Sequence, residues 1–473
     1  MPTARRPIPF GATILGLAAL ALIAVAGMAR APSAADARVS IEQVGDADLR
    51  VSYAMKKPRR ELIFRTVEGG YRARRWTIET PGFRLLRLDG EDRIVRLDGK
   101  RFDAVTVAAR PDIVHLPKDY QPVVRYGDGG ALVYTGHFWP VTVRGSRVNA
   151  TFDLRPAPGG QTVAFGKRAP ALEDWRSPMA HPAFVYMGPL PPIETDHVVA
   201  LVDPETPAWI VEELHVLTAD AFDFFANAFG YAPEPKPTLF LAVGRGRDPN
   251  RFRFSGDALP GQFQITLEGA AWGEPSEEGR RLFRRLAIHE AFHLWQSVRA
   301  RPLSEDVAGW IHEGGAEAAA AEAMLALGYW DAAAFEAFRD GAKEQCADGL
   351  EDGPLARAHE RGAFRALYDC GFLIAEAAAR ADGGSVTDFW RDFMDDAYRR
   401  GGYSEDHFYD FVAARTGDRA FARKVRGFVQ APLADPAREI DRLARAAAST
   451  RAGAPTLAPP PLHRRTGVDR ARL

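Results

Sequence analysis

The sequence has few cysteines, no excess of charge of either sign, and only one long apolar run. Two cysteines among 473 residues are too few for a cysteine-based metal site or a disulfide-rich scaffold. The 61 basic and 62 acidic residues leave a net charge of −1, so no nucleic acid or anionic membrane surface is expected as a partner. The length exceeds one ordinary hydrophobic core, which predicts two or three domains.

The one long apolar run lies at the beginning of the chain, within residues 1–37. Arg5 and Arg6 precede the run, and Ala35-Asp36-Ala37 follows it as a possible cleavage site of the A-x-A type. This segment is either a cleaved signal peptide or a single membrane anchor. Both readings predict an exported protein that is periplasmic or faces the exterior. In that setting Cys346 and Cys370 can pair, although two buried free thiols remain the alternative.

The composition changes along the chain and predicts an α+β multidomain protein. Residues 38–165 contain short β-branched runs separated by Gly, Asp and Pro turns, which predicts a β-sandwich-like domain. Residues 166–195 are rich in Pro and Gly and are expected to form a surface linker. Residues 196–447 become Ala-rich and helical after two expected strands. The remainder, 448–473, contains Pro459-Pro460-Pro461 and is expected to be a disordered tail.

The motif that carries chemistry is the H-E-x-x-H segment that begins at His289. On a helix, His289 and His293 lie one turn apart on the same face, so both imidazoles can reach one metal ion. Glu290 lies beside the first histidine and is placed to activate a water molecule. Ser276 is the expected N-cap of this helix. Two histidines on a helical stripe can also be ordinary core residues, so the interpretation depends on a third ligand.

A third ligand is expected at Glu313, which follows His293 after a gap of nineteen residues. Ser304, Glu305 and Asp306 are expected to begin a second helix that folds back against the first. Two histidines and one glutamate leave a fourth zinc position open, which is the pattern of catalytic zinc sites. The sequence therefore predicts a Zn²⁺ centre.

Two neighbours of Glu313 are expected to lie close to this centre. Glu317, one turn further along the helix, is placed to accept a hydrogen bond from the free N–H of a ligand histidine, or else is a surface carboxylate. His312 is expected near the metal but not on it, because adjacent helical residues point about 100° apart.

At these residues the sequence resembles the gluzincin metallopeptidases. The gap to Glu313 is similar to that of thermolysin, and Trp295 resembles the aminopeptidase N family. The segments H-E-A-F-H-L-W-Q and W-I-H-E-G-G-A-E resemble the glycyl aminopeptidase family. The resemblance implies a β-rich domain before a thermolysin-like, mostly helical zinc peptidase domain, and a peptide or protein substrate.

The resemblance also implies two further features of the site. Tyr368-Asp369-Cys370-Gly371 resembles a Y-x-x-G segment whose tyrosine binds the oxyanion of the transition state, although a core tyrosine is the alternative for Tyr368. Aminopeptidase N proteins read the free amine of the substrate with a G-A-M-E-N segment on an edge strand. The expected counterpart of that strand, 261–267, contains no carboxylate, and Glu268 lies only at its end.

The sequence therefore predicts an exported, aminopeptidase-like zinc metallopeptidase. Glu290 is its general base, and Tyr368 is the expected donor to the oxyanion. Two other functions are compatible with the residues. One is a non-catalytic envelope protein that binds peptides or a partner on a peptidase fold, and the other is a zinc hydrolase with a non-peptide substrate.

Overall fold

A computed structural model describes residues 34–67, 70–111, 116, 119–178, 181–244, 251–300, 302–303 and 308–453. The apolar run of the predicted leader lies outside these residues, as do Ser304 to Asp306 and the tail from residue 454. Among the described residues, no helix is both long and apolar enough to cross a bilayer.

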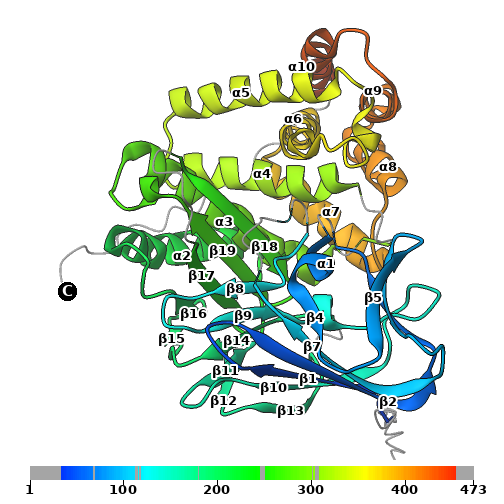
Figure 1. The fold of residues 1–473 in the computed structure, drawn as a ribbon. Coiled ribbons are helices and arrows are strands. Elements are labelled where there is room, and N and C mark those ends of the chain that lie inside the picture. Colours follow the sequence, from blue (N-terminus) through cyan, green and yellow to red (C-terminus); the bar gives the residue numbers. More distant parts are fainter. Residues whose placement is uncertain are drawn as a thin grey trace, which may run out of the picture. The chain divides into compact units, whose positions relative to one another are not determined.

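The first part of the described chain is built from three β-sheets (Figure 1). A six-stranded sheet is antiparallel except where β1 pairs in parallel with β10. In spatial order its strands are β13 (Leu172–Trp175), β10 (Ala150–Arg155), β1 (Ala37–Gln43), β2 (Leu49–Arg59), β7 (Phe102–Ala109) and β4 (Trp76–Ile78). A small sheet follows the order β3 (Glu61–Arg65), β6 (Glu91–Arg96) and β5 (Phe83–Leu88), and the short helix α1 (Tyr71–Arg75) lies between β3 and β4.

The third sheet corrects the prediction of a surface linker over residues 166–195. Its strands are β12 (Lys167–Ala169), β11 (Gln161–Ala164), β14 (Phe184–Gly188), β9 (Ala131–Tyr134) and β8 (Val123–Arg125). Every residue of β14 is buried, because Val185 and Met187 enter one core while Phe184 and Tyr186 enter another. Pro and Gly flank this strand instead of forming a linker, and a strand buried on both faces has a continuous apolar run.

The fourth sheet is formed by the next part of the chain and contains the two strands that the sequence predicted there. Its order is β15 (Ile193–Glu194), β16 (Val199–Val202), β17 (Thr238–Gly244), β19 (Gln262–Glu268) and β18 (Arg253–Leu259). The three central strands are parallel, and β18 runs antiparallel to β19 at one edge. One face of this sheet packs on the third sheet through Leu201 and Phe240, and its other face packs on helices.

The rest of the described chain is helical, as predicted, with short 3₁₀ turns. The helices are α2 (Ala208–Phe229), α3 (Glu277–Arg299), α4 (Gly309–Ala326), α5 (Ala332–Leu350), α6 (Phe364–Asp382), α7 (Val386–Arg400), α8 (Glu405–Thr416), α9 (Arg419–Gln430) and α10 (Pro436–Gly453). Helix α10 continues to Gly453, so residues 448–453 are helical where the sequence predicted a disordered tail. Its apolar stripe explains the extension, since Ile440, Leu443 and Ala447 are buried against the helical core.

The beginning of the folded part also differs slightly from its prediction. The backbone of Asp36 accepts from Lys56 N at 2.9 Å and donates to Asn149 O at 2.7 Å. Strand β1 itself begins at Ala37. Asp36 and Ala37 therefore belong to the sheet, and the predicted boundary at residue 38 is two residues late.

Helices α4 and α6 cross at unusually close range because glycine faces glycine. A Cβ added to Gly314 would lie 2.2 Å from Gly371 Cα, and one added to Gly371 would lie 2.3 Å from Trp310 O. A Cβ added to Gly315, the next residue of α4, would lie 2.3 Å from the ring of Trp390. Only residues without a side chain permit this crossing, and it brings the turn of α4 that holds Glu313 beside the turn of α6 that holds Tyr368.

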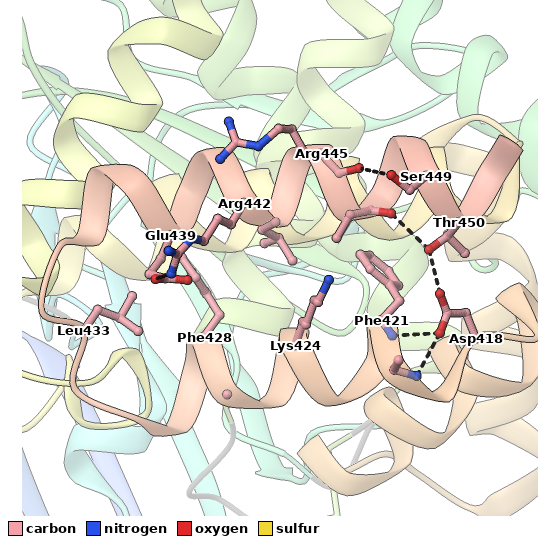
Figure 2. Close-up of a pocket in the computed structure, with 14 residues that line it drawn as sticks. Asp418, Phe421, Lys424, Phe428, Leu433, Glu439, Arg442, Arg445, Ser449 and Thr450 are labelled. Atoms are coloured by element: carbon pink, nitrogen blue, oxygen red, sulfur yellow. Dashed lines mark hydrogen bonds and ion pairs between the residues drawn. The ribbon is translucent and has the colours of Figure 1, made fainter.

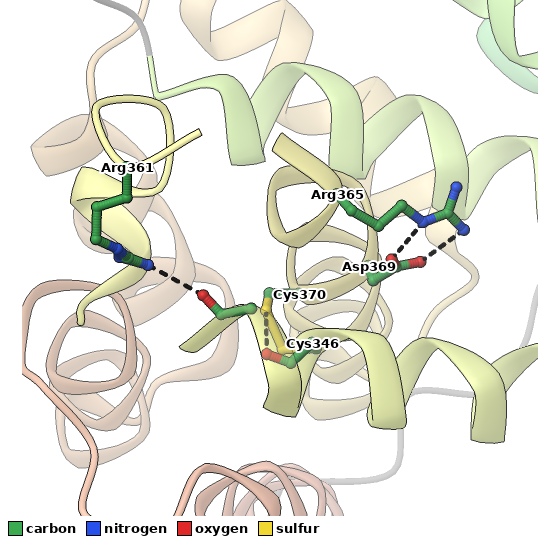
Figure 3. The surroundings of a disulfide bond; sticks show 6 residues. Cys346, Arg361, Arg365, Asp369 and Cys370 are labelled. Carbon is green, nitrogen blue, oxygen red and sulfur yellow. Dashed lines mark hydrogen bonds and ion pairs between the residues drawn. A yellow bond between two sulfur atoms is a disulfide. The ribbon is translucent and has the colours of Figure 1, made fainter. Parts of the chain in front are cut away.

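The two cysteines form a disulfide, which settles the alternative that the sequence left open. Cys346 on α5 is bonded to Cys370 on α6, and both residues are fully buried (Figure 3). Helix α6 packs against both α4 and α5 (Figure 1). The disulfide therefore ties α6 to α5 one residue before the glycine at which α6 crosses α4.

The glycine crossing yields a prediction about stability. Gly371→Ala is expected to lower the free energy of unfolding by about 1–3 kcal/mol, the usual cost of overpacking, because the backbone of α4 must move. Gly341→Ala is the matched control: nothing lies within 4 Å of its added Cβ on α5. Alanine is the better helix former, so the control is expected to be neutral or stabilising by up to about 1 kcal/mol. Equal unfolding midpoints in denaturant for the two variants would contradict the account.

Candidate metal centre

Helix α3 presents the H-E-x-x-H residues on a buried face. The predicted cap is present, since Ser276 Oγ accepts from Gly279 N at 3.0 Å, and Glu277 and Glu278 complement the helix dipole in the first turn. Further along, Trp295 donates to Tyr231 O at 2.9 Å and fixes α3 to the end of α2. With the helix held in this way, His289 and His293 are each about 95% buried, at 4% and 5% exposure.

The side chains of His289, His293 and Glu313 converge on one point. The two Nε2 atoms are 3.2 Å apart, and Glu313 Oε2 lies 3.3 Å from His289 Nε2 and 3.5 Å from His293 Nε2. Atoms bound to a tetrahedral zinc at about 2.0–2.2 Å lie about 3.3–3.6 Å from one another. The triangle therefore has the dimensions of one face of a zinc coordination tetrahedron, and these three residues fit that metal.

The hydrogen-bond partners of both histidines favour the tautomer that a metal requires. His289 Nδ1 donates to Glu317 Oε2 at 2.9 Å, and His293 Nδ1 donates to the amide oxygen of Gln296 at 2.6 Å. The orientation of that amide is set by its Nε2, which donates to His312 O at 3.0 Å. With protons on both Nδ1 atoms, the Nε2 lone pairs point at the shared centre, as in other metal sites whose ligands are oriented by outer hydrogen bonds.

The surroundings favour a positive charge at this centre. Burial lowers the pKa of His289, but hydrogen bonds with Glu313 and Glu317 outweigh it and raise the pKa to about 10. Burial raises the pKa of Glu317, yet the neighbouring Arg285 and His289 hold it at about 2, so this carboxylate remains ionised. The carboxylates around the centre therefore favour a cation, which is either a second proton on His289 or a metal ion held by the three ligand atoms.

Glu290 is buried against the edge strand, on the face where β18 meets α3. A Cβ added to Gly256 would lie 2.2 Å from Glu290 Oε1, so the carboxylate occupies the space where a side chain would otherwise be. The side chain of Glu290 is adjacent to the ligand triangle and lines the same cleft. The absence of a side chain at Gly256 thus gives Glu290 its place beside the ligand triangle.

The edge strand is not the one that the sequence predicted. Residues 262–267 of that stretch belong to β19, which has β17 on one side and β18 on the other, so it has no free edge. The edge is β18, and it carries a carboxylate, Asp257, which accepts from the amide of Gln264. Strand order depends on long-range pairing and could not be read from local composition. The strand at the edge of the sheet therefore carries a carboxylate, whereas the strand that the sequence predicted there has none.

A cleft with a volume of about 490 Å³ contains these groups. Its walls come from β18, α3, α4 and α6, and from a segment of the β-rich part that contributes Asp119 and Tyr120. A larger hollow of about 760 Å³ lies elsewhere, between α9 and α10, and all of its lining residues fall between Asp418 and Thr450 (Figure 2). The three candidate ligands and Glu290 all line the smaller cleft.

Tyr368 also lines the cleft, and its ring stacks on His289 with centroids 5.6 Å apart. Burial raises the pKa of Tyr368 well above its ordinary value, and the nearby Glu313 and Glu290 raise it further. The phenol therefore keeps its proton and remains a hydrogen-bond donor. His312 lies beside the centre, where its ring stacks on His293 at 4.2 Å between centroids.

Several residues around the cleft were not singled out from the sequence. Gln296 had a local signal, because it continues the helical stripe of His289 and His293. Arg285 had the same kind of signal, because it lies one turn before His289 on α3. The others line the cleft from separate elements and had no such signal: Asp119, Tyr120, Asp257 and Arg365. They come together only through the packing of the sheets and helices, which sequence spacing does not reveal.

Solved structures share this architecture. A structure described as an aminopeptidase N family protein from Idiomarina loihiensis aligns with a TM-score of 0.61 and 12% identity, over 86% of this chain and 78% of that one. A two-domain M1 zinc metallopeptidase, in a mutant bound to L-arginine, aligns with a TM-score of 0.51 and 16% identity, over 84% and 93%. Yeast LTA4 hydrolase in complex with bestatin aligns with a TM-score of 0.52 and 12% identity, over 86% and 71%.

The fold is that of the M1 zinc metallopeptidases. The predicted fold class, a β-sheet region followed by a mostly helical gluzincin-like region, is thereby confirmed. No protein-family model matches the sequence. No curated protein matches it either.

The hydrogen bond between His293 and Gln296 yields a prediction about metal affinity. Gln296→Ala removes the acceptor that fixes the His293 tautomer, so zinc affinity is expected to fall about 10- to 100-fold. The measurement is competition for zinc with a chromophoric chelator. Gln430→Ala on α9 is the matched control, since the amide of Gln430 donates to Glu405 and its side chain lies outside the cleft lining. Unchanged affinity in the Gln296 variant would show that the bond does not orient a ligand.

Proposed function

We propose that this chain is an exported zinc metallopeptidase that hydrolyses peptide bonds and acts on free N-termini. The observation that carries the proposal is the meeting of three ligand atoms, a buried carboxylate and an open strand edge in one cleft. Each of these features has a structural explanation by itself, but only metal-assisted hydrolysis of an extended substrate uses all of them.

The ligand set determines the chemistry that a metal would contribute. Zinc held by His289, His293 and Glu313 would polarise the scissile carbonyl and lower the pKa of a bound water toward neutrality. Glu290, immobilised against Gly256, takes the proton of the attacking water and passes it to the leaving amine. Tyr368, which remains protonated, donates a hydrogen bond to the oxyanion that develops on the carbonyl.

The edge strand supports a peptide as the substrate. The outer side of β18 has no strand paired to it among the described residues, and Ser255, Gly256 and Asp257 line the cleft. An extended peptide can pair with such an edge through backbone hydrogen bonds, which fixes its direction past Glu290. Two carboxylates of the cleft, Asp257 on this strand and Asp119 on the segment of the β-rich part, are suited to a free amino group and favour aminopeptidase action.

The disulfide supports export. Structural disulfides form and persist in oxidising compartments and are rare in the cytosol of most organisms. The bond between Cys346 and Cys370 lies beside the active-site helix α6, where it secures the helix that holds Tyr368. Together with the apolar run of the first residues, it favours a location in the periplasm or facing the exterior, with the leader cleaved or kept as an anchor.

The proposal is tested by incubating a peptide mixture with zinc-loaded protein and identifying the products by mass spectrometry. We expect stepwise shortening from free N-termini and little cleavage of N-acetylated peptides. Glu290→Gln is expected to bind zinc as the wild type does but to hydrolyse about 10²–10⁴ times more slowly, because the general base is lost.

The other outcomes identify the competing functions. Internal cleavage would keep the peptidase but overturn the aminopeptidase assignment. Binding without cleavage would favour a non-catalytic peptide-binding protein. An absence of both, with intact zinc binding, would point to a non-peptide hydrolase. Cleavage that survives in Glu290→Gln would exclude Glu290 as the base.

The oxyanion role of Tyr368 yields a separate prediction. Tyr368→Phe is expected to lower kcat about 10²–10³-fold with little change in KM, because the lost hydrogen bond forms mainly in the transition state. Steady-state kinetics on one short peptide provide the measurement. Tyr403→Phe is the control, a buried tyrosine outside the cleft lining. A rise in KM at unchanged kcat would instead assign Tyr368 to ground-state binding.

A further inference from the structure

Two arginines line the cleft on the side formed by helices α3 and α6. Arg285 lies one turn before His289 on α3, and Arg365 lies one turn before Tyr368 on α6. The acidic residues of the cleft outside the metal centre, Asp119 and Asp257, belong to other walls. Apart from the metal centre and Glu290, the cleft therefore has its carboxylates on the side of β18 and the β-rich part, and its guanidinium groups on the helical side.

Each guanidinium is held in place by a buried carboxylate. Arg285 forms an ion pair with Glu317 and lies over the ring of Phe338, at 5.3 Å from its centroid. Arg365 donates from Nε to Asp369 Oδ2 at 2.6 Å and from Nη2 to Asp369 Oδ1 at 3.2 Å (Figure 3). A guanidinium has five N–H donors, so this bidentate contact leaves donors for a ligand and costs the ligand little ordering of the side chain.

The exposure of Arg365 distinguishes it from a simple counterion. Its side chain is 54% exposed although that of Asp369 is 1% exposed, so the cation extends from a buried anchor into the cleft. Arg285 is 14% exposed, and its carboxylate Glu317 already serves His289. An anchored, solvent-facing arginine beside a second one is the arrangement that recognises carboxylates.

We propose that Arg365, with Arg285 beside it, binds a carboxylate of the substrate on the C-terminal side of the scissile bond. This inference rests on the proposed function. The acidic wall suits the amino group and repels a carboxylate, so the opposite charge of a short peptide is received by the helical wall. The volume of about 490 Å³ is that of a pocket for a ligand of drug size, roughly 300–1,000 Å³, which suits a peptide of a few residues.

The carboxylate has two possible sources, the C-terminus of a very short peptide or an acidic side chain after the scissile bond. Two peptide pairs separate them. Ala-Ala is compared with Ala-Ala amide, which lacks the C-terminal charge. Ala-Glu amide is compared with Ala-Gln amide, which lacks only the side-chain charge.

Binding is measured by calorimetry on zinc-loaded Glu290→Gln protein, which removes turnover from the readout. In at least one pair the charged peptide is expected to bind about tenfold more tightly or better, as for loss of one charge-assisted hydrogen bond. Adding Arg365→Gln is expected to reduce the preference to about twofold or less. Adding Arg380→Gln is expected to leave it intact, since Arg380 forms the same kind of i,i+4 ion pair with Glu376 on α6 outside the cleft lining.

Arg365→Gln leaves Asp369 without its partner, so its fold is checked by thermal unfolding. Burial raises the pKa of Asp369 to about 6 even against Arg365, which allows the carboxyl to take up a proton when the arginine is absent. The double variant with Asp369→Asn removes both charges and is expected to lose the preference in the same way.

The outcomes separate this inference from the proposed function. Equal affinities within both pairs, or a preference that survives Arg365→Gln and the double variant, would overturn the carboxylate site. If the wild-type protein nevertheless cleaves the peptides, the carboxylate site is wrong but the peptidase assignment stands. An Arg365-dependent preference without any cleavage would keep the site and overturn the peptidase. An absence of both binding and cleavage would overturn both.

Discussion

The electrostatic repulsion among three converging ligand atoms is the constraint around which the site is built. Two imidazole lone pairs and a carboxylate oxygen lie 3.2–3.5 Å apart in a region from which most water is excluded. In the absence of a metal ion, Arg285 and a second proton on His289 offset part of this negative charge, and a metal ion would offset more of it. The surrounding contacts hold the atoms in place against that repulsion, so the ion that binds there receives a preformed site.

The supports for this arrangement come from several levels of the fold. Glu317 and Gln296 fix the two imidazoles through their Nδ1 protons. The contact between Gly314 and Gly371 lets α4 and α6 approach until Glu313 and Tyr368 share one cleft. The third sheet, buried on both faces, packs against the fourth and brings Asp119 and Tyr120 to the opposite wall. The cleft is thus a product of the β-rich and helical parts together.

Sequence reasoning reached the parts of this site that depend on local geometry. The spacing of His289 and His293 follows from the helical repeat, and Ser276 marks the start of the helix that carries them. It did not reach contacts set by long-range pairing. The edge position of β18, and with it Asp257, depends on which strands pair, and the sequence favoured β19 instead. Strand β14 was hidden between Pro- and Gly-rich stretches that resemble a linker, although its five consecutive buried residues mark a central strand.

The central claim is that His289, His293 and Glu313 hold a zinc ion and leave one position open. Crystals of zinc-loaded protein, measured with anomalous diffraction at the zinc absorption edge, test it most directly. The account predicts one anomalous peak about 2.0–2.2 Å from the two Nε2 atoms and a Glu313 oxygen, with a water as the fourth ligand. A peak elsewhere, a fourth protein ligand such as His312, or no zinc at these residues at full loading would contradict it.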